Sequence, residues 1–191
     1  MPYEKFDVTR LARLNDESRF EDLDPVVLWD ALGMTDPAVI VEIGAGTGLF
    51  AARFAAMAPA SIIYAVDMEP VMVDWIRDNR SEVASGAIVP VLSTETTVPL
   101  SDESSDAVLM LNLHHELARP DETYAEAARL LREGGRVLVA DWSPEAEQER
   151  PPRHLRATSA QLAEALAEAG FTEMTVHEGL PRHTLVTATR I

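Results

Sequence analysis

Three closely spaced glycines follow a run of apolar residues, in the segment Val41-Glu42-Ile43-Gly44-Ala45-Gly46-Thr47-Gly48. Glycines let the backbone turn sharply and approach a ligand closely, and free amides at the start of a following helix attract an electron-rich group. Leu49 stands where a dinucleotide fingerprint needs its third glycine, and no Gly-Lys-Ser/Thr follows for a phosphate loop. The carboxylate of Glu42 would repel a pyrophosphate and suits an ammonium group. The loop therefore predicts a site for an amino-acid-like ligand, and a plain tight turn is the alternative.

A second acidic residue, Asp67, ends the next apolar run. A carboxylate at the end of a second strand can accept hydrogen bonds from both hydroxyls of a ribose, and Met68 could pack against an adenine ring. The alternative role of Asp67 is a helix cap before Pro70, and the two roles are compatible. Together with the glycine loop, the position favours a ribose contact.

Two imidazoles and a carboxylate, His114-His115-Glu116, follow a later apolar run. A histidine titrates near neutrality, so His115 could act as a general base, with Glu116 orienting or replacing it. Alternatively, the histidines begin a connecting helix, one packed inside and one outside. A metal site is a third interpretation, but adjacent residues on a helix diverge by about 100°, which argues against it. Further along, Trp142 could wall a pocket or close the core.

The spacing of apolar residues predicts alternating strands and helices, the order of an α/β domain with a parallel sheet. The predicted strands are 37–43, 61–66, 87–92, 106–111, 136–140, 171–177 and 184–189. The predicted helices are 47–57, one opening at Pro70, one capped by Asp121 and ended by Gly134-Gly135, and one that begins near Thr158 and ends at Gly170. Thr158 and Gln161 have capping-box spacing, and Pro90 inside the third strand is typical of a sheet edge.

Polar segments flank this pattern at 1–36 and 143–157. We expect an N-terminal helical cap over 1–36 and one domain over 37–191, with a surface loop or lid at 143–157. Basic and polar residues in both segments are further pocket candidates, with a solvated loop as the default interpretation. These candidates are Arg13, Asn15, Arg19, Arg153, His154 and Arg156.

The 191-residue chain has a formal net charge of -16. Such a surface repels phosphate backbones, which favours a small molecule over nucleic acid as a partner, although solubility alone would explain it. The chain has no cysteine, so disulfides, thiolate metal sites and cysteine nucleophiles are excluded. It has no apolar run of membrane-spanning length and no secretory signal at its first residues. We therefore expect a cytoplasmic protein without a membrane span.

Four segments together resemble the class I S-adenosylmethionine-dependent methyltransferases, and among them the small-molecule group that includes the ubiquinone/menaquinone-biosynthesis methyltransferases. They are Val-Glu-Ile-Gly-Ala-Gly-Thr-Gly (41–48), Tyr-Ala-Val-Asp-Met-Glu-Pro-Val-Met (64–72), Val-Pro-Leu-Ser-Asp-Glu-Ser-Ser-Asp (98–106) and Leu-Leu-Arg-Glu-Gly-Gly-Arg-Val-Leu-Val-Ala-Asp-Trp (130–142). The resemblance implies a Rossmann-like three-layer sandwich. Its seven-stranded, mostly parallel sheet would have the order 3-2-1-4-5-7-6, with strand 7 antiparallel. In that order the third strand is an edge, in agreement with Pro90.

The resemblance also implies that S-adenosyl-L-methionine is the cofactor. Its methionine part would lie against the glycine loop, its ribose on Asp67 and its adenine beside Met68. The family usually has an aspartate after the third strand, where this chain has Ser93-Thr94-Glu95, so both Thr94 and Glu95 are candidates for the adenine contact. The implied cofactor-binding residues are Glu42, Gly44, Ala45, Gly46, Thr47, Gly48, Asp67, Met68, Thr94, Glu95, Leu111 and Asn112.

The predicted function is methyl transfer to O, N or C of a small-molecule acceptor, an activity of class EC 2.1.1. The candidate catalytic residues are His115, His114 and Glu116. A non-catalytic sensor or partner protein that binds the donor, and a protein or RNA methyltransferase, are alternatives. The acidic charge counts against RNA, and no Asn-Pro-Pro-Tyr-type motif follows the fourth strand. Leu49 disfavours a nicotinamide-dependent oxidoreductase.

Overall fold

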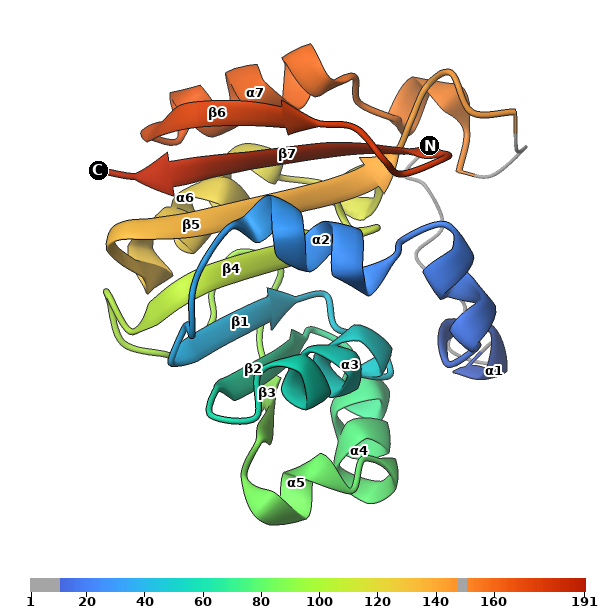
Figure 1. Ribbon diagram of the computed structural model, residues 1–191, viewed down its shortest axis with the longest axis vertical. Helices are drawn as coiled ribbons and strands as arrows, with labels where there is room; N and C mark the ends of the chain where they lie inside the picture. The colour runs from blue at the N-terminus through green and yellow to red at the C-terminus, as the bar shows by residue number, and fades with distance from the viewer. Residues whose placement is uncertain (1–10, 148–150) are drawn as a thin grey trace.

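The computed structural model describes residues 11–147 and 151–191, which form a seven-stranded sheet with helices on both faces (Figure 1). The strand order is β3-β2-β1-β4-β5-β7-β6. Strand β7 runs antiparallel to its neighbours β5 and β6, and the other pairs are parallel. The order and the antiparallel strand are as predicted. The strands are β1 (Val39–Ile43), β2 (Ile62–Asp67), β3 (Ile88–Leu92), β4 (Ser105–Leu111), β5 (Leu131–Trp142), β6 (Phe171–His177) and β7 (His183–Arg190).

The helices divide between the two faces of the sheet. On one face α2 packs against β5 while α3 and α4 pack against β2 and β3, and apolar side chains of all three share one core cluster with Ile40, Ile63 and Leu109. On the other face α6 and α7 cover Val108, Val137 and neighbouring residues. The helical segments are α1 (Leu11–Leu14), η2 (Glu17–Glu21), α2 (Pro25–Leu32), α3 (Leu49–Met57), α4 (Pro70–Asn79), α5 (Glu82–Ser85), η3 (His114–Glu116), α6 (Pro120–Leu130), η4 (Arg153–Leu155) and α7 (Ser159–Glu168).

The central strands are apolar on both faces because helices cover both. Every residue of β4 is buried, which is the pattern expected of a strand inside a parallel sheet. Pro90 lies in β3, at the sheet edge as predicted, where its missing N–H breaks no ladder. The arrowheads of β1 and β5 point to the same edge of the sheet, on the side where α1 lies (Figure 1). Loops after parallel strands therefore converge at this edge.

Both predicted boundaries of α6 were wrong, and α3 begins at Leu49, two residues after the predicted start. Helix α6 ends at Leu130, and Gly134-Gly135 lie inside β5, where the pairing with β4 is irregular between Ser105 and Ala107. The glycines accommodate this irregularity, since Gly134 has a φ of 75°. Asp121 lies in the first turn of α6 and does not cap it, because Pro120 already occupies the first turn and Arg119 is the N-cap.

The capping box of α7 was predicted correctly. Thr158 Oγ1 accepts from the Gln161 amide at 3.2 Å, and the Gln161 side chain accepts from the Thr158 amide at 2.9 Å. Within residues 11–36 the structure has α1, η2 and α2, and the rest of the expected cap lies outside the described residues. The division into a cap and one domain stays a prediction. Among the described residues, no helix is long and apolar enough to cross a membrane.

Candidate functional site

The glycine loop forms the turn between β1 and α3. Gly44, Gly46 and Gly48 all have positive φ, at 76°, 55° and 65°. The amides of Gly44 and Ala45 both donate to Val66 O at 2.9 Å, which ties the loop to the end of β2. A Cβ on Gly44 would lie 2.7 Å from Leu113 Cδ1, so the half-buried Leu113 side chain would have to move to make room for it. The predicted segment thus forms a tight turn whose left-handed backbone favours glycine, and it holds three glycines close to the ends of β1 and β2.

Asp67 ends β2 beside this loop. Its Oδ2 accepts from the Gly46 amide at 2.7 Å and its Oδ1 from the Glu69 amide at 2.9 Å. Burial raises the pKa of its carboxyl, and the amides of Glu69 and Gly46 oppose the shift. The N-cap of α4 is Glu69, so Asp67 fixes the turn before the helix and is not its cap. The two predicted ligand segments are therefore hydrogen-bonded to each other.

Glu42 is the buried acid of the loop, with 2% of its surface exposed. Its Oε2 has no hydrogen-bond partner among the described residues. Burial raises the pKa of the Glu42 carboxyl to about 8, although the Arg19 guanidinium opposes the shift. A buried carboxyl with an unused oxygen fits a cationic ligand group, as the sequence suggested.

The N-terminal segment closes over the loop. Thr47 Oγ1 donates to Leu14 O at 3.2 Å, and Arg80 Nε donates to Thr47 O at 2.8 Å. Arg80 also hydrogen-bonds the side chain of Asn15. Arg19 is one of the expected pocket candidates. Its guanidinium carbon lies 5.1 Å from the centroid of the Phe50 ring, and its charge interacts with the carboxyl groups of Glu42 and Glu116.

The candidates for the adenine lie farther along the same edge. Met68 is 36% exposed after β2. Thr94 is exposed in the loop after β3, and its amide donates to Thr97 O. The Oε1 of Glu95 accepts from the Ala118 and Arg119 amides at 2.6 and 2.9 Å, so this carboxylate already anchors the entry to α6. The choice between Thr94 and Glu95 stays open.

Leu111 and Asn112 mark the end of β4. Leu111 is buried, while Asn112 has a φ of 55°, a left-handed conformation that asparagine tolerates. The Asn112 amide donates to Ala140 O, and its Oδ1 lies 2.8 Å from His183 Nε2. His183 was missed from the sequence, since it begins β7 far along the chain. Burial lowers the pKa of its imidazole to about 4, and its Nδ1 is buried with no partner among the described residues.

His115 lies in η3, directly after β4, and is almost fully buried. Its Nδ1 is 2.8 Å from Asp141 Oδ1 at the end of β5, and Asp141 is fully buried. The Trp142 amide donates to the same oxygen at 2.7 Å. The sequence suggested Glu116 as the group that orients His115, but Glu116 Oε1 is 3.7 Å from His115 Nε2, so Asp141 has the stronger contact.

His114 points to a different partner. Its Nδ1 lies 2.7 Å from the Tyr124 hydroxyl of α6, and the two rings stack with centroids 6.0 Å apart. Burial lowers the pKa of the His114 imidazole. The two adjacent histidines therefore diverge, as expected for neighbours on one helical turn, and His115 is the one held by a carboxylate.

One of the three candidates in the 143–157 loop differs from the expectation of a solvated loop. Arg156 is buried, and its guanidinium donates to Pro151 O and Ala146 O at 2.7 and 2.8 Å, so it holds the loop together. Arg153 and His154 are exposed. Trp142 lies beside the His183 ring, with centroids 4.1 Å apart, and is only partly buried.

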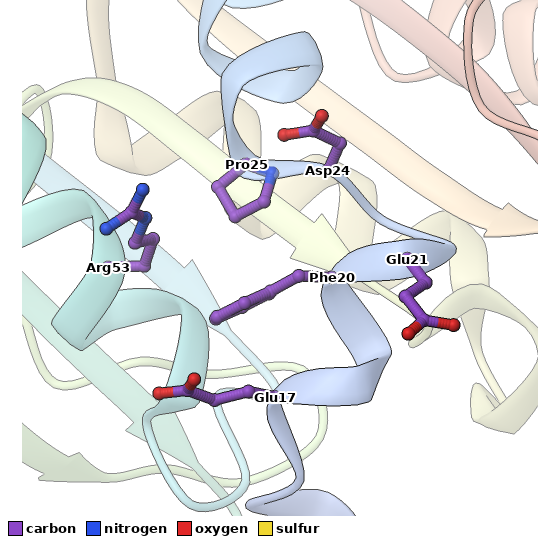
Figure 2. A pocket seen from close by; sticks show the side chains of 6 residues that line it. All are labelled: Glu17, Phe20, Glu21, Asp24, Pro25 and Arg53. Carbon is purple, nitrogen blue, oxygen red and sulfur yellow. The ribbon is translucent and has the colours of Figure 1, made fainter.

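Figure 2 shows a separate surface depression between η2, the start of α2 and α3. Its volume is about 460 Å³. Arg53 of α3 and Phe20 of η2 line it together with acidic residues of the N-terminal segment. No predicted cofactor-binding or catalytic residue lines this depression. It is therefore distinct from the edge of the sheet at which the glycine loop, Asp67 and His115 converge.

Comparison with known proteins finds methyltransferases among the relatives of this chain. An uncharacterized methyltransferase-like protein of Schizosaccharomyces pombe is 35% identical over 108 residues, 56% of this chain and 40% of that protein. A malonyl-[acyl-carrier protein] O-methyltransferase of Geobacter sulfurreducens is 30% identical over 159 residues, 75% of this chain and 59% of that protein. This chain therefore matches only 40% to 59% of the length of these two relatives.

The fold has a solved counterpart in a SAM-dependent methyltransferase from Aquifex aeolicus, with a TM-score of 0.90 at 24% identity over 98% of this chain and 100% of that one. A family model described as a methyltransferase domain matches residues 41–139, which are 99 of the 191 residues. The match begins two residues before Ile43 and so includes the whole glycine loop, Asp67 and His115. This chain, with its class I S-adenosylmethionine-dependent methyltransferase fold, belongs to the methyltransferase domain family.

Proposed function

We propose that this chain transfers the methyl group of S-adenosyl-L-methionine to a small-molecule acceptor. The observation that carries the proposal is the buried Glu42 carboxyl, whose Oε2 lacks a partner among the described residues beside three glycines with positive φ. A cationic amino-acid group satisfies such an oxygen, and the glycines leave room for it. Family membership supports the same donor.

In this arrangement each segment would hold one part of the donor. The glycine loop and Glu42 would bind the methionine part, and Asp67 the ribose hydroxyls. Met68, with Thr94 or Glu95, would bind the adenine. The backbone of Leu111 and Asn112 would face the sulfonium. The donor supplies an activated methyl group, so the protein has chiefly to align an acceptor with the S–CH₃ bond.

His115 is the proposed general base. It lies at the end of β4, at the same edge as the loop that follows β1, and Asp141 accepts a hydrogen bond from its Nδ1. A carboxylate in this position fixes the imidazole tautomer, with the proton on Nδ1 and the lone pair on Nε2. Glu116 and His114 are secondary candidates. Their side chains lie against His115 and Tyr124, respectively.

The acceptor is proposed to be a small molecule because the chain has a net charge of -16, which repels nucleic acid. The name of the Geobacter relative makes a malonyl group one candidate to test. Trp142, together with His183, would form a wall of the acceptor pocket.

Two measurements test the proposal. A thermal-shift titration should show that S-adenosylhomocysteine raises the melting temperature while NAD does not, because a ligand of the folded state stabilises it. Incubation with labelled S-adenosylmethionine and a metabolite extract should then label a small molecule. Binding without any transfer would indicate a non-catalytic donor-binding protein, and absence of binding at millimolar concentration would defeat the proposal.

A further inference from the structure

We propose that the donor site holds its purine base chiefly by apolar contact and meets the polar edge of that base with the neutral hydroxyl of Thr94. A donor whose base lacks the 6-amino group should then bind nearly as well as one that has it. This inference rests on the proposed function and makes Thr94 the residue that sets the base specificity of that site. The features that carry it are the turn after β3, the direction of the Glu95 carboxyl, and the exposed side chains of Met68 and Leu92.

The turn after β3 lies directly beside the proposed ribose contact. Leu92, the last residue of β3, is the register partner of Asp67, the last residue of β2. The amide of the next residue, Ser93, donates to Asp67 O at 3.0 Å. A nucleoside whose sugar is bound by the Asp67 carboxylate therefore has Met68 and the residues that follow β3 as the neighbours of its base.

Two large apolar side chains are exposed at the ends of these strands. Met68, directly after β2, is 36% exposed, and Leu92 is 49% exposed. The flat face of a base that packs against them removes apolar surface from water, which is favourable and needs no particular direction. This contribution depends on the ring of the base and is the same with or without an amine on its edge.

The carboxylate that follows β3, Glu95, is turned toward a different part of the fold. Its Oε1 accepts from the amides of Ala118 and Arg119 at 2.6 and 2.9 Å, and its main-chain carbonyl accepts from Thr123 Oγ1 at 3.3 Å. These three partners belong to the entry and first turns of α6, which covers the face of the sheet opposite to α4. Glu95 thus fastens the turn to α6, and Thr94 is the residue that the turn presents to solvent.

Thr94 offers a weak contact to an amine. The residue is exposed, its amide donates to Thr97 O at 3.0 Å, and its hydroxyl lies 3.5 Å from the same oxygen, at the limit of a hydrogen bond. A hydrogen bond from the base to this exposed neutral hydroxyl replaces one made with water, so its net contribution to affinity is small. A carboxylate at the same position would accept a charge-assisted hydrogen bond, which is about twice as strong.

Calorimetric titration of the full chain tests this inference with two matched ligands. One is S-adenosylhomocysteine, and the other is its analogue in which hydrogen replaces the 6-amino group of the base. The two share the homocysteine, the ribose and the ring system, so a difference in affinity reports the amine alone. The dissociation constants of the wild type should agree within about threefold.

Substitutions at Thr94 change the acceptor that the amine meets. Thr94→Asp should create a preference of about tenfold for S-adenosylhomocysteine over the analogue, because the new carboxylate accepts a charge-assisted hydrogen bond. Thr94→Val removes the hydroxyl with little change of shape and should keep the two affinities nearly equal. Ser101→Asp adds the same charge at an exposed position before β4, at the opposite edge of the sheet, and should behave like the wild type.

A substitution at Leu92 tests the apolar contact separately. Leu92→Ser should weaken the binding of both ligands by the same factor, about threefold or more, since it removes apolar surface that the ring covers. Because Leu92 is half exposed, the variant should unfold thermally close to the wild type. Unchanged affinity of Leu92→Ser for both ligands would contradict the proposed contact.

The remaining outcomes separate this inference from the proposed function. If the wild type binds the analogue tenfold or more weakly than S-adenosylhomocysteine, a stronger acceptor holds the amine and the inference alone is overturned. An equal affinity of Thr94→Asp for the two ligands would also overturn it, because Thr94 would then not face the base. If the wild type does not bind S-adenosylhomocysteine at millimolar concentration, the proposed function fails, and the inference fails with it.

Discussion

Gly44 has the strictest steric requirement of the glycine loop. Its φ is 76°, and a Cβ would lie 2.7 Å from Leu113 Cδ1. Gly44→Ala should therefore weaken binding of S-adenosylhomocysteine by tenfold or more, since an alanine strains the left-handed backbone of the loop and displaces the Leu113 side chain, and destabilise the fold by about 1–2 kcal/mol. Calorimetric titration and urea unfolding measure the two effects.

Gly86 is the matched control for this substitution. It has a φ of 79° and no atom within 4 Å of a Cβ. Gly86→Ala therefore imposes the same backbone strain without a clash, far along the chain from the loop. It should cost stability and leave affinity unchanged. Equal affinities in the two alanine variants would show that the loop tolerates a side chain at Gly44.

The Glu42 carboxyl makes stability depend on pH. Its pKa is raised by burial to about 8 in the folded protein, and it is near its ordinary value in the unfolded chain. Between about pH 5 and 8 the folded protein therefore holds a proton that the unfolded chain has lost, so the free energy of unfolding falls as pH rises. The slope from this group is at most about 1.4 kcal/mol per pH unit.

In the Glu42→Gln variant the free energy of unfolding should fall less steeply as pH rises. Urea denaturation at several pH values measures this slope. Some slope should persist, because burial also raises the pKa of Asp67. Glu133→Gln, at an exposed position, is the control and should keep the wild-type slope. A Glu42→Gln protein with an unchanged slope would mean that the carboxyl is ionised in the folded state.

At the scale of single residues, the sequence predicted those site residues whose pattern lies within one short segment. The glycine loop and Asp67 were found because their spacing is local. Asp141 lies in one of the four segments that resemble the family, 130–142, but its contact with His115 was not predicted, and His183 was missed altogether. Both contacts depend on which strands are neighbours in the sheet, which no local spacing reveals.

The short N-terminal segments α1 and η2 are held to the site by Arg80, the C-cap residue of α4. Its Nε donates to Thr47 O at 2.8 Å, and it also hydrogen-bonds Asn15. Arg80→Ala should release this segment and lower the affinity for S-adenosylhomocysteine by about fivefold, equivalent to roughly 1 kcal/mol. Limited proteolysis should then cut residues 11–21 faster.

Arg77 of the same helix provides the control. It is exposed and pairs with Asp74, one turn earlier on the same helix. Arg77→Ala should leave affinity and proteolysis as they are, because exposed pairs contribute little. Identical behaviour of the two arginine variants would show that Arg80 does not restrain the segment.

Elements were predicted well where apolar patterning and caps agree, as for α7 and the buried strands. The error at Gly134-Gly135 has a physical cause. A glycine pair usually ends a helix, but here Leu131 is buried at the start of β5 and pairs with Ser105, so the strand begins before the glycines. Side-chain burial in the sheet outweighed the local turn preference.

For the whole molecule, the parallel strands run in the same direction, so every loop that follows one of them lies at the same edge of the sheet. If the donor binds there, S-adenosylhomocysteine should slow amide hydrogen exchange in residues 44–48, 67–69, 93–97 and 112–117, and in the N-terminal segment 11–21. Bound ligand suppresses local opening where it contacts the backbone. Exchange measured by mass spectrometry should be unchanged at the opposite edge, in residues 58–61, 103–105, 133–135 and 169–170. Protection spread equally over both edges would mean that binding rigidifies the whole sheet, and protection confined to the opposite edge would place the donor away from the glycine loop.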